Sequence, residues 1–276
     1  MKWTAFKSYD WSEFCDVVAK RAGSFGWQTG SQVHSLSGWN GTANFYENVQ
    51  LLRSGWPEGR ARIVAGVEAL QATQDDWSPQ WAMDAAGAFP DVGAYLAGDI
   101  EHMHNPDMEE PATPILRLSV AGVASSQIET WQMENFGIAL LTLIDSLERD
   151  GRQIELTYQA TMGITKPSRK GSKKHVWSGL PPCSVQVVLK HAGEHMDLDR
   201  LAYALAHPAM LRRSVFAVME QHGEFAPLGE HFGSPIDYPD AAKDSEIMYL
   251  PRLCPELYDL NSPARALASL RPFIEL

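Results

Sequence analysis

The chain has little cysteine, no long apolar run and no excess of positive charge. Its 276 residues include three cysteines, Cys15, Cys183 and Cys254, without Cys-x-x-Cys spacing, which argues against a disulfide framework and a zinc finger. The longest apolar run, GIALLTLI, stops at Asp145, well short of the ~18–20 residues that cross a membrane. The N-terminal MKWTAFKSYDW lacks the apolar core of a secretory signal. These absences predict a protein of a reducing cytoplasm.

Motifs of the common enzyme classes are also missing. The sequence contains no GxSxG elbow, no GxxxxGK[ST] loop, no HExxH and no GxGxxG after a strand. Cys15 and His34 could supply a nucleophile and a base, but a buried structural thiol is the simpler interpretation of Cys15. We therefore predict a protein that is not an enzyme and needs no cofactor, with an unrecognised enzyme as the alternative.

The segment GDIEHMHNPDMEE gathers carboxylates and imidazoles between Asp99 and Glu110. These groups suit a divalent metal, and His-x-His occurs in metal sites. No helix or strand spacing in this segment fixes a coordination geometry, however, so a hydrated acidic loop is the simpler interpretation. We predict no metal site and keep a metal-dependent enzyme as an alternative.

Hydrophobic periodicity predicts a strand, a helix and a strand in the middle of the chain. Residues 115–123 alternate, residues 128–151 repeat apolar positions at helical spacing, and residues 153–162 alternate strictly, with Tyr158 in the inward phase. This order implies a crossover between parallel strands. A further strand at residues 184–192 most simply pairs antiparallel. We therefore predict an α+β fold with a mixed sheet, helices mainly on one face, and not an oligonucleotide-binding barrel.

The pattern also predicts the domain organisation. Residues 1–222 form a single α+β domain, with a helical N-terminal part at 1–112 and the strand–helix–strand core at 113–222. Residues 223–276 hold seven of the 17 prolines and predict a Pro-rich C-terminal extension over the surface.

Positive charge is concentrated in one zone of an acidic chain. The formal net charge is −11, yet residues 156–193 contain six Lys or Arg and no Asp or Glu. Five of these cations lie between residues 166 and 174, in a connection longer than the ~12–15 residues above which a loop is usually functional or disordered. This segregation of charge predicts a cationic loop held between two strands.

Such a loop suits single-stranded nucleic acid. Flexible Lys and Arg side chains can follow phosphates, and an aromatic ring can stack on bases, each stack contributing roughly 1–3 kcal/mol. The candidate nucleic-acid-binding residues are Lys166, Arg169, Lys170, Lys173, Lys174, His175, Trp177 and Lys190. A solvated loop without a partner, and a loop that docks on an acidic protein, remain the alternatives.

Two motifs and the central core also resemble a known family. The segments GWPEGRARI (55–63) and FPDVGAYLAGDIEHM (89–103), together with the strand–helix–strand core, resemble tailed-phage proteins, and most of all the single-stranded-DNA-binding RNA polymerase cofactors (Drc-like) of Schitoviridae podophages. The resemblance implies binding of single-stranded DNA and of a phage RNA polymerase, which the protein recruits to unwound promoters in the host cytoplasm.

We therefore predict a phage single-stranded-DNA-binding protein that acts as a transcription cofactor and can form a homo-oligomer. The alternative function is a protein–protein adaptor or inhibitor whose basic loop docks on an acidic partner. Membranes are not expected partners.

Overall fold

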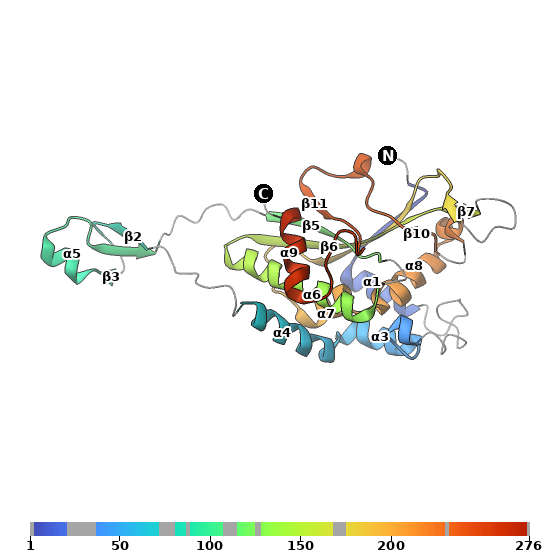
Figure 1. Cartoon of the computed structure of the whole chain (residues 1–276), viewed down its shortest axis with the longest axis horizontal. Helices are drawn as coiled ribbons and strands as arrows, with labels where there is room; N and C mark the ends of the chain where they lie inside the picture. The colour runs from blue at the N-terminus through green and yellow to red at the C-terminus, as the bar shows by residue number, and fades with distance from the viewer. Residues whose placement is uncertain are drawn as a thin grey trace.

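A six-stranded mixed sheet organises the molecule (Figure 1). The structure is a computed structural model that describes residues 3–20, 37–71, 81–86, 89–106, 115–124, 128–167, 175–229 and 232–274. The sheet has the order β1 (Ala5–Asp10), β9 (Cys183–Lys190), β6 (Gln153–Gly163), β5 (Ile115–Ala121) and β11 (Ile247–Leu250), and β10 (Ser234–Pro235) also pairs with β6.

The predicted strand–helix–strand unit is confirmed. Strands β5 and β6 are parallel and are joined by α6 (Thr130–Arg149), while β9 pairs antiparallel with β6. The N-terminal end of α6 is fixed by a capping box between Glu129 and Gln132, which satisfies backbone N–H groups that a helix leaves free. The fold class is therefore the predicted α+β arrangement, and the described strands close no barrel.

Helices cover one face of this sheet, as predicted (Figure 1). α6 lies against β6 and is itself packed by α4, α7 and α9. The remaining helical elements are α1 (Trp11–Lys20), α2 (Ser37–Asn40), α3 (Phe45–Ser54), α4 (Pro57–Gln71), α7 (Leu198–Ala206), the π-helix η2 (Met210–Val215), α8 (Phe216–Gln221), the 3₁₀ helices η3 (Gly223–Leu228) and η4 (Asp240–Ala242), and α9 (Pro263–Ile274).

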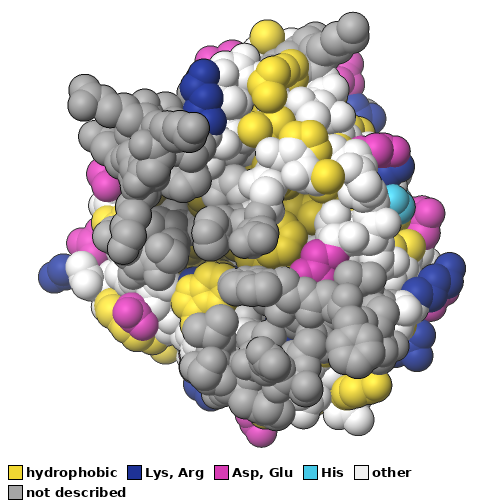
Figure 2. All heavy atoms as spheres, turned by 90° about the vertical axis from the view of Figure 1, so that its right-hand side faces the viewer, with side chains coloured by type: hydrophobic (Ala, Val, Ile, Leu, Met, Phe, Trp, Pro, Cys, Tyr) yellow, Lys and Arg dark blue, Asp and Glu magenta, His cyan; other side chains and the backbone are white. Residues whose placement is uncertain are grey.

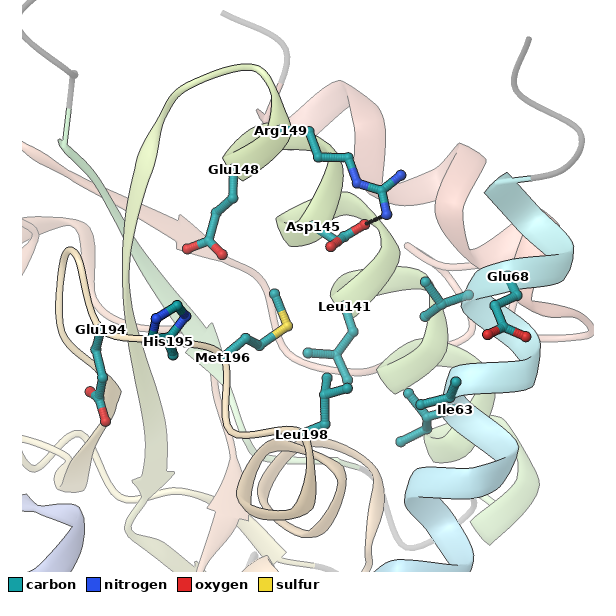
Figure 3. A pocket seen from close by; sticks show the side chains of 12 residues that line it. Ile63, Glu68, Leu141, Asp145, Glu148, Arg149, Glu194, His195, Met196 and Leu198 are labelled. Carbon is teal, nitrogen blue, oxygen red and sulfur yellow. Dashed lines mark ion pairs between the residues drawn. The ribbon is translucent and has the colours of Figure 1, made fainter. Parts of the chain in front are cut away.

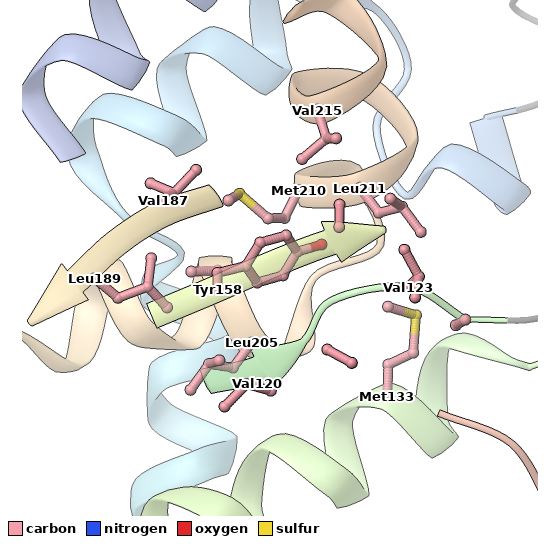
Figure 4. Packing of buried hydrophobic residues seen from close by; sticks show 14 of the residues in the cluster. Val120, Val123, Met133, Tyr158, Val187, Leu189, Leu205, Met210, Leu211 and Val215 are labelled. Atoms are coloured by element: carbon pink, nitrogen blue, oxygen red, sulfur yellow. The ribbon is translucent and has the colours of Figure 1, made fainter. Parts of the chain in front are cut away.

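The core lies between the sheet and these helices. Inward residues of β6 and β9 alternate with outward ones, and Tyr158 sits among Val187, Met210 and Leu211 (Figure 4). Its hydroxyl donates to the carbonyl oxygen of Gly122 at 2.7 Å. A Cβ at Gly122 would lie only 1.9 Å from the Tyr158 ring. This close approach therefore requires glycine at position 122, since a methyl group cannot fit there.

Both ends of the chain contribute strands that the periodicity did not predict. β1 pairs parallel with β9 at one edge, and β11 pairs parallel with β5 at the other. Residues 223–276 were predicted to form an extension over the surface. In the structure they add β10 and β11 to the main sheet and pack α9 against α6.

A small sheet lies apart from the main body at the left of Figure 1. It contains β2 (Trp81–Asp84), β4 (Met103–Pro106) and β3 (Phe89–Pro90) in this order, with α5 (Val92–Ala97) between β3 and β4. We call residues 81–106 the small lobe. The sequence predicted an acidic loop over residues 98–110; in the described part of that segment the structure has the strand β4.

A buried polar cluster joins α3, α7 and η2. The Tyr203 hydroxyl donates to Asn48 Oδ1 at 2.7 Å, and Ser214 Oγ lies 2.8 Å from the same hydroxyl. His207 lies beside this cluster, stacked on Tyr203, and its Nδ1 accepts the backbone N–H of Ala209 at 3.1 Å. Burial, with a smaller effect of Arg62, lowers the pKa of His207 from 6.5 to about 4. The folded protein therefore holds this imidazole neutral.

The neutral His207 makes stability depend on pH. Below pH ~6.5 the unfolded chain binds a proton at His207, and the folded chain does so only below about pH 4. The free energy of unfolding should therefore fall by about 2 kcal/mol between pH 7 and pH 5 through this residue alone. His207→Asn, which keeps an acceptor for Ala209, should lose that part of the pH dependence in urea unfolding. The exposed His195→Asn is the control and should keep it.

Candidate nucleic-acid interface

The second face of the main sheet is formed by residues that point away from the helical core. Three rows cross it from β1 through β9 to β6: Phe6–Ser184–Thr161, Ser8–Gln186–Gln159 and Asp10–Val188–Thr157. Ser184 Oγ lies 3.0 Å from Thr161 Oγ1, and Gln159 Nε2 donates to Ser184 Oγ at 3.3 Å. Because these buried polar groups satisfy one another, the centre of the face is held rigidly.

Four aromatic rings form a line on this face, which we call the aromatic row. Trp3 lies 5.5 Å from Phe6 and 5.3 Å from Tyr238, between ring centroids, and Tyr238 stacks on Tyr249 at 4.7 Å. Phe6 is 37% exposed, the most open ring of the row. The row thus offers an open aromatic surface at its Phe6 end.

The two strands that flank the predicted cationic loop lie at the same end of the sheet. β7 (Thr165–Pro167) and β8 (His175–Trp177) pair antiparallel and continue the β6–β9 pair beyond Gly163. We call the β7–β8 pair the hairpin. The N–H of Thr4 donates to the carbonyl oxygen of Pro182 at 3.0 Å. Trp3 therefore lies at the base of the hairpin, beside the segment that joins β8 to β9.

The structure places some of the predicted site residues and not others. Lys166 is exposed on β7. His175 and Trp177 lie on β8, with Trp177 opposite Thr165, and their side chains are outside the description. The following predicted residues also lie outside the described part of the chain: Arg169, Lys170, Lys173 and Lys174.

Lys190 does not belong to the predicted site. Its side chain is 3% exposed, and its Nζ pairs with Glu148 at 2.7 Å and donates to the carbonyl oxygen of Ile154 at 3.1 Å. The register shifts between Leu156 and Thr157 of β6 and brings Lys190 opposite the core residue Leu156, as a bulge can re-aim a side chain. The ammonium is therefore occupied inside the protein and cannot contact a phosphate.

Described charges of both signs lie at each end of this face. The end that bears the hairpin carries the exposed Lys166 and, after β10, the Asp237–Arg252 pair. Asp10, Glu155 and Glu246 lie toward the opposite end, where Arg117 pairs with both glutamates. Attraction of an anionic chain to the hairpin end would therefore depend on the cations of the predicted loop.

Figure 2 shows the end of the molecule from which the hairpin projects. Among the side chains of described residues, hydrophobic ones run through the middle of this view, and both cationic and acidic side chains lie toward its margin.

One family comparison gives a match. A family model described as a domain of unknown function, DUF7192, matches residues 4–272. The chain belongs to the DUF7192 family. The match includes β1 and most of α9, so the elements at both ends that complete the sheet are parts of the DUF7192 domain.

The comparisons of this DUF7192 chain with curated proteins and with solved structures give no match. Within the described ranges, no helix has both the length and the apolar character required to span a membrane.

A pocket of this DUF7192 domain lies on the helical side. This pocket of about 480 Å³ opens between α4, α6 and the segment before α7, with Ile63, Leu141 and Met196 among its apolar residues (Figure 3). Three of its four carboxylates are in ion pairs: Asp145 with Arg149 at 3.0 Å, Glu148 with Lys190 at 2.7 Å and Glu194 with Arg200 at 3.1 Å. These three are not free to act as a general base, and the fourth, Glu68, is an exposed residue of α4.

Two enzyme hypotheses receive no geometric support from the DUF7192 structure. Cys15 is buried on α1, where burial raises the pKa of its thiol to about 11, so the thiolate is scarce at neutral pH. His34, its proposed partner, lies outside the described residues. No group of three metal-ligating side chains occurs in the part of the chain that the structure describes, and Asp107, Glu109 and Glu110 lie outside that part.

The aromatic row was not predicted from the sequence. Trp3 and Phe6 lie in a segment predicted as helical, and Tyr238 and Tyr249 in one predicted as an extension. One signal could have found β1: Ala5, Lys7 and Tyr9 alternate with Phe6, Ser8 and Asp10, a pattern typical of a strand.

Proposed function

We propose that this protein binds single-stranded nucleic acid across the hairpin end of its main sheet. The observation that carries the proposal is the position of exposed Phe6 and half-buried Trp3 at the base of the cationic hairpin. These rings are more than 150 residues away from the hairpin in sequence. Stacking on the rings and charge on the hairpin together match the two parts of a nucleotide.

A single strand fits this surface better than a duplex. The rings of Phe6 and Trp3 can stack only on bases whose faces are free, and duplex bases already stack on each other. The net charge of −11 opposes general adhesion to nucleic acid, so binding is confined to the one cationic end.

The resemblance to phage polymerase cofactors supplies the finer part of the proposal. In this view the protein is a non-enzymatic transcription cofactor in the host cytoplasm that holds an unwound promoter strand and recruits a phage RNA polymerase. The sheet face takes the DNA, and the acidic remainder of the chain is left for the second protein. The rival function, docking of the basic loop on an acidic partner protein, predicts binding of neither single strand nor duplex.

Phe6→Ala should weaken binding of a labelled single strand by roughly 5- to 150-fold, because one base stack contributes about 1–3 kcal/mol. The measurement is a fluorescence anisotropy titration with a single strand and with the same sequence as duplex. The unchanged protein should prefer the single strand.

Tyr46→Ala is the matched control, because Tyr46 is a 63% exposed ring on α3, on the helical side. It should bind as the unchanged protein does. If Phe6→Ala and Trp3→Ala both fold and bind the single strand with unchanged affinity, the sheet face is not the interface. If neither strand nor duplex binds, the adaptor function replaces the proposal.

A further inference from the structure

The small lobe exposes a set of large apolar side chains. Its exposed residues include Phe89 at 59%, Val92 at 63%, Tyr95 at 63%, Leu96 at 78% and Ile100 at 81%. Val92, Tyr95 and Leu96 follow one another at i, i+3 and i+4 on α5, so they share one face of that helix. Contiguous exposed apolar surface of this kind marks sites of interaction in soluble proteins.

Local hydrogen bonds fix both ends of α5. The Asp91 carboxylate accepts the N–H groups of Gly93 and Ala94 at 2.8 and 3.0 Å, and Gly98 ends the helix in the left-handed region. No residue of α5 is buried. A helix of this length is marginal in water without packing, so a surface that covers its apolar face would stabilise it.

The sequence in and beside the small lobe carries charge of one sign. Residues 63–116 contain ten Asp or Glu and no Lys or Arg, and Asp91, Asp99 and Glu101 are described residues of the lobe. Two lobes placed face to face would therefore oppose carboxylates, which disfavours a second copy of this chain as the cover. The surface instead matches an apolar patch bordered by Lys and Arg.

We propose that the small lobe is a protein-docking site for a partner that presents an apolar surface bordered by Lys and Arg. Leu96 and Ile100 are the most exposed of its apolar side chains and form the centre of the contact, where buried apolar anchors contribute most to binding. The acidic residues around them select a cationic partner and repel nucleic acid. The small lobe and the sheet face would therefore bind partners of opposite charge.

The test uses a short amphipathic helical peptide of leucine and lysine as the probe, titrated into the full chain and followed by lobe amide shifts in NMR spectra. The unchanged protein should bind it, and Leu96→Glu and Ile100→Glu should each weaken binding by roughly tenfold or more. Leu257→Glu, at a 43% exposed leucine of the main body, is the control and should bind normally.

Two further peptides test the chemistry, one with glutamate in place of lysine and one with serine in place of leucine. Both should bind much more weakly. Equal binding of the glutamate peptide, or unchanged binding by Leu96→Glu, would overturn the proposal. So would a dimer in sedimentation velocity that Leu96→Glu dissociates, because the occupant would then be a second copy. All lobe variants should bind single strands normally, which keeps this test independent of the sheet face.

Discussion

Replacing Arg169, Lys170, Lys173 and Lys174 together with Ala should flatten the salt dependence of single-strand binding. Each phosphate contact contributes a slope of about −0.7 to log K against log salt, so the five loop cations together predict about −3.5 and the variant about −0.7. At low salt the variant should bind orders of magnitude more weakly, since four released counterions per complex are lost. Anisotropy titrations over a series of salt concentrations measure both quantities.

The chain offers a matched control for this loop variant. Arg53, Arg60, Arg62 and Arg265 are surface arginines in ion pairs outside the sheet face. Their joint replacement by Ala changes net charge by the same amount and should leave the slope near that of the unchanged protein. A folded loop variant with an unchanged slope would remove the loop from the interface. An equal change in both variants would mean that overall charge, and not the loop, controls binding.

Lys190→Met should destabilise the fold by about 3 kcal/mol without changing the salt slope. The substitution removes the partner of Glu148 and the donor to the Ile154 carbonyl oxygen, and breaking one side of a buried pair leaves an uncompensated charge. Glu148 keeps 27% of its side chain exposed, which places the expected cost at the low end. Urea unfolding gives the free energy of unfolding.

The double variant Lys190→Met, Glu148→Leu separates the lost pair from lost packing. An apolar pair of similar volume removes the unpaired carboxylate, so much of the stability should return. Failure of the double variant to recover would assign the loss to packing of the Lys190 stem. A flatter salt slope in folded Lys190→Met would contradict the buried position and return Lys190 to the interface.

The central elements of the fold could be predicted because their pattern is local. In α6 the apolar side chains recur at helical spacing over twenty residues, and β6 alternates over eleven. β10 has two residues and β11 four, too few for a period to show. Their positions depend on pairing with β6 and β5, far away in sequence.

The candidate site also has a part that could be predicted from local sequence and a part that could not. The cationic zone can be predicted because the charge of each residue follows from its identity. Lys166 is exposed in the structure, which is consistent with a cationic binding loop. Lys190 belongs to the same zone in sequence, yet the register shift in β6 removes it from solvent. Counting charges along the sequence could not predict that Lys190 is buried, because strand register is set by contacts between strands.

The α+β class, the crossover around α6 and the segregation of positive charge follow from the order of residues alone. Strand pairing and packing were needed to place Trp3 and Phe6 at the base of the hairpin, to bury Lys190, and to leave the apolar face of α5 exposed. Periodicity and charge are properties of neighbours along the chain, whereas a binding surface is made by residues that meet only when distant strands pair.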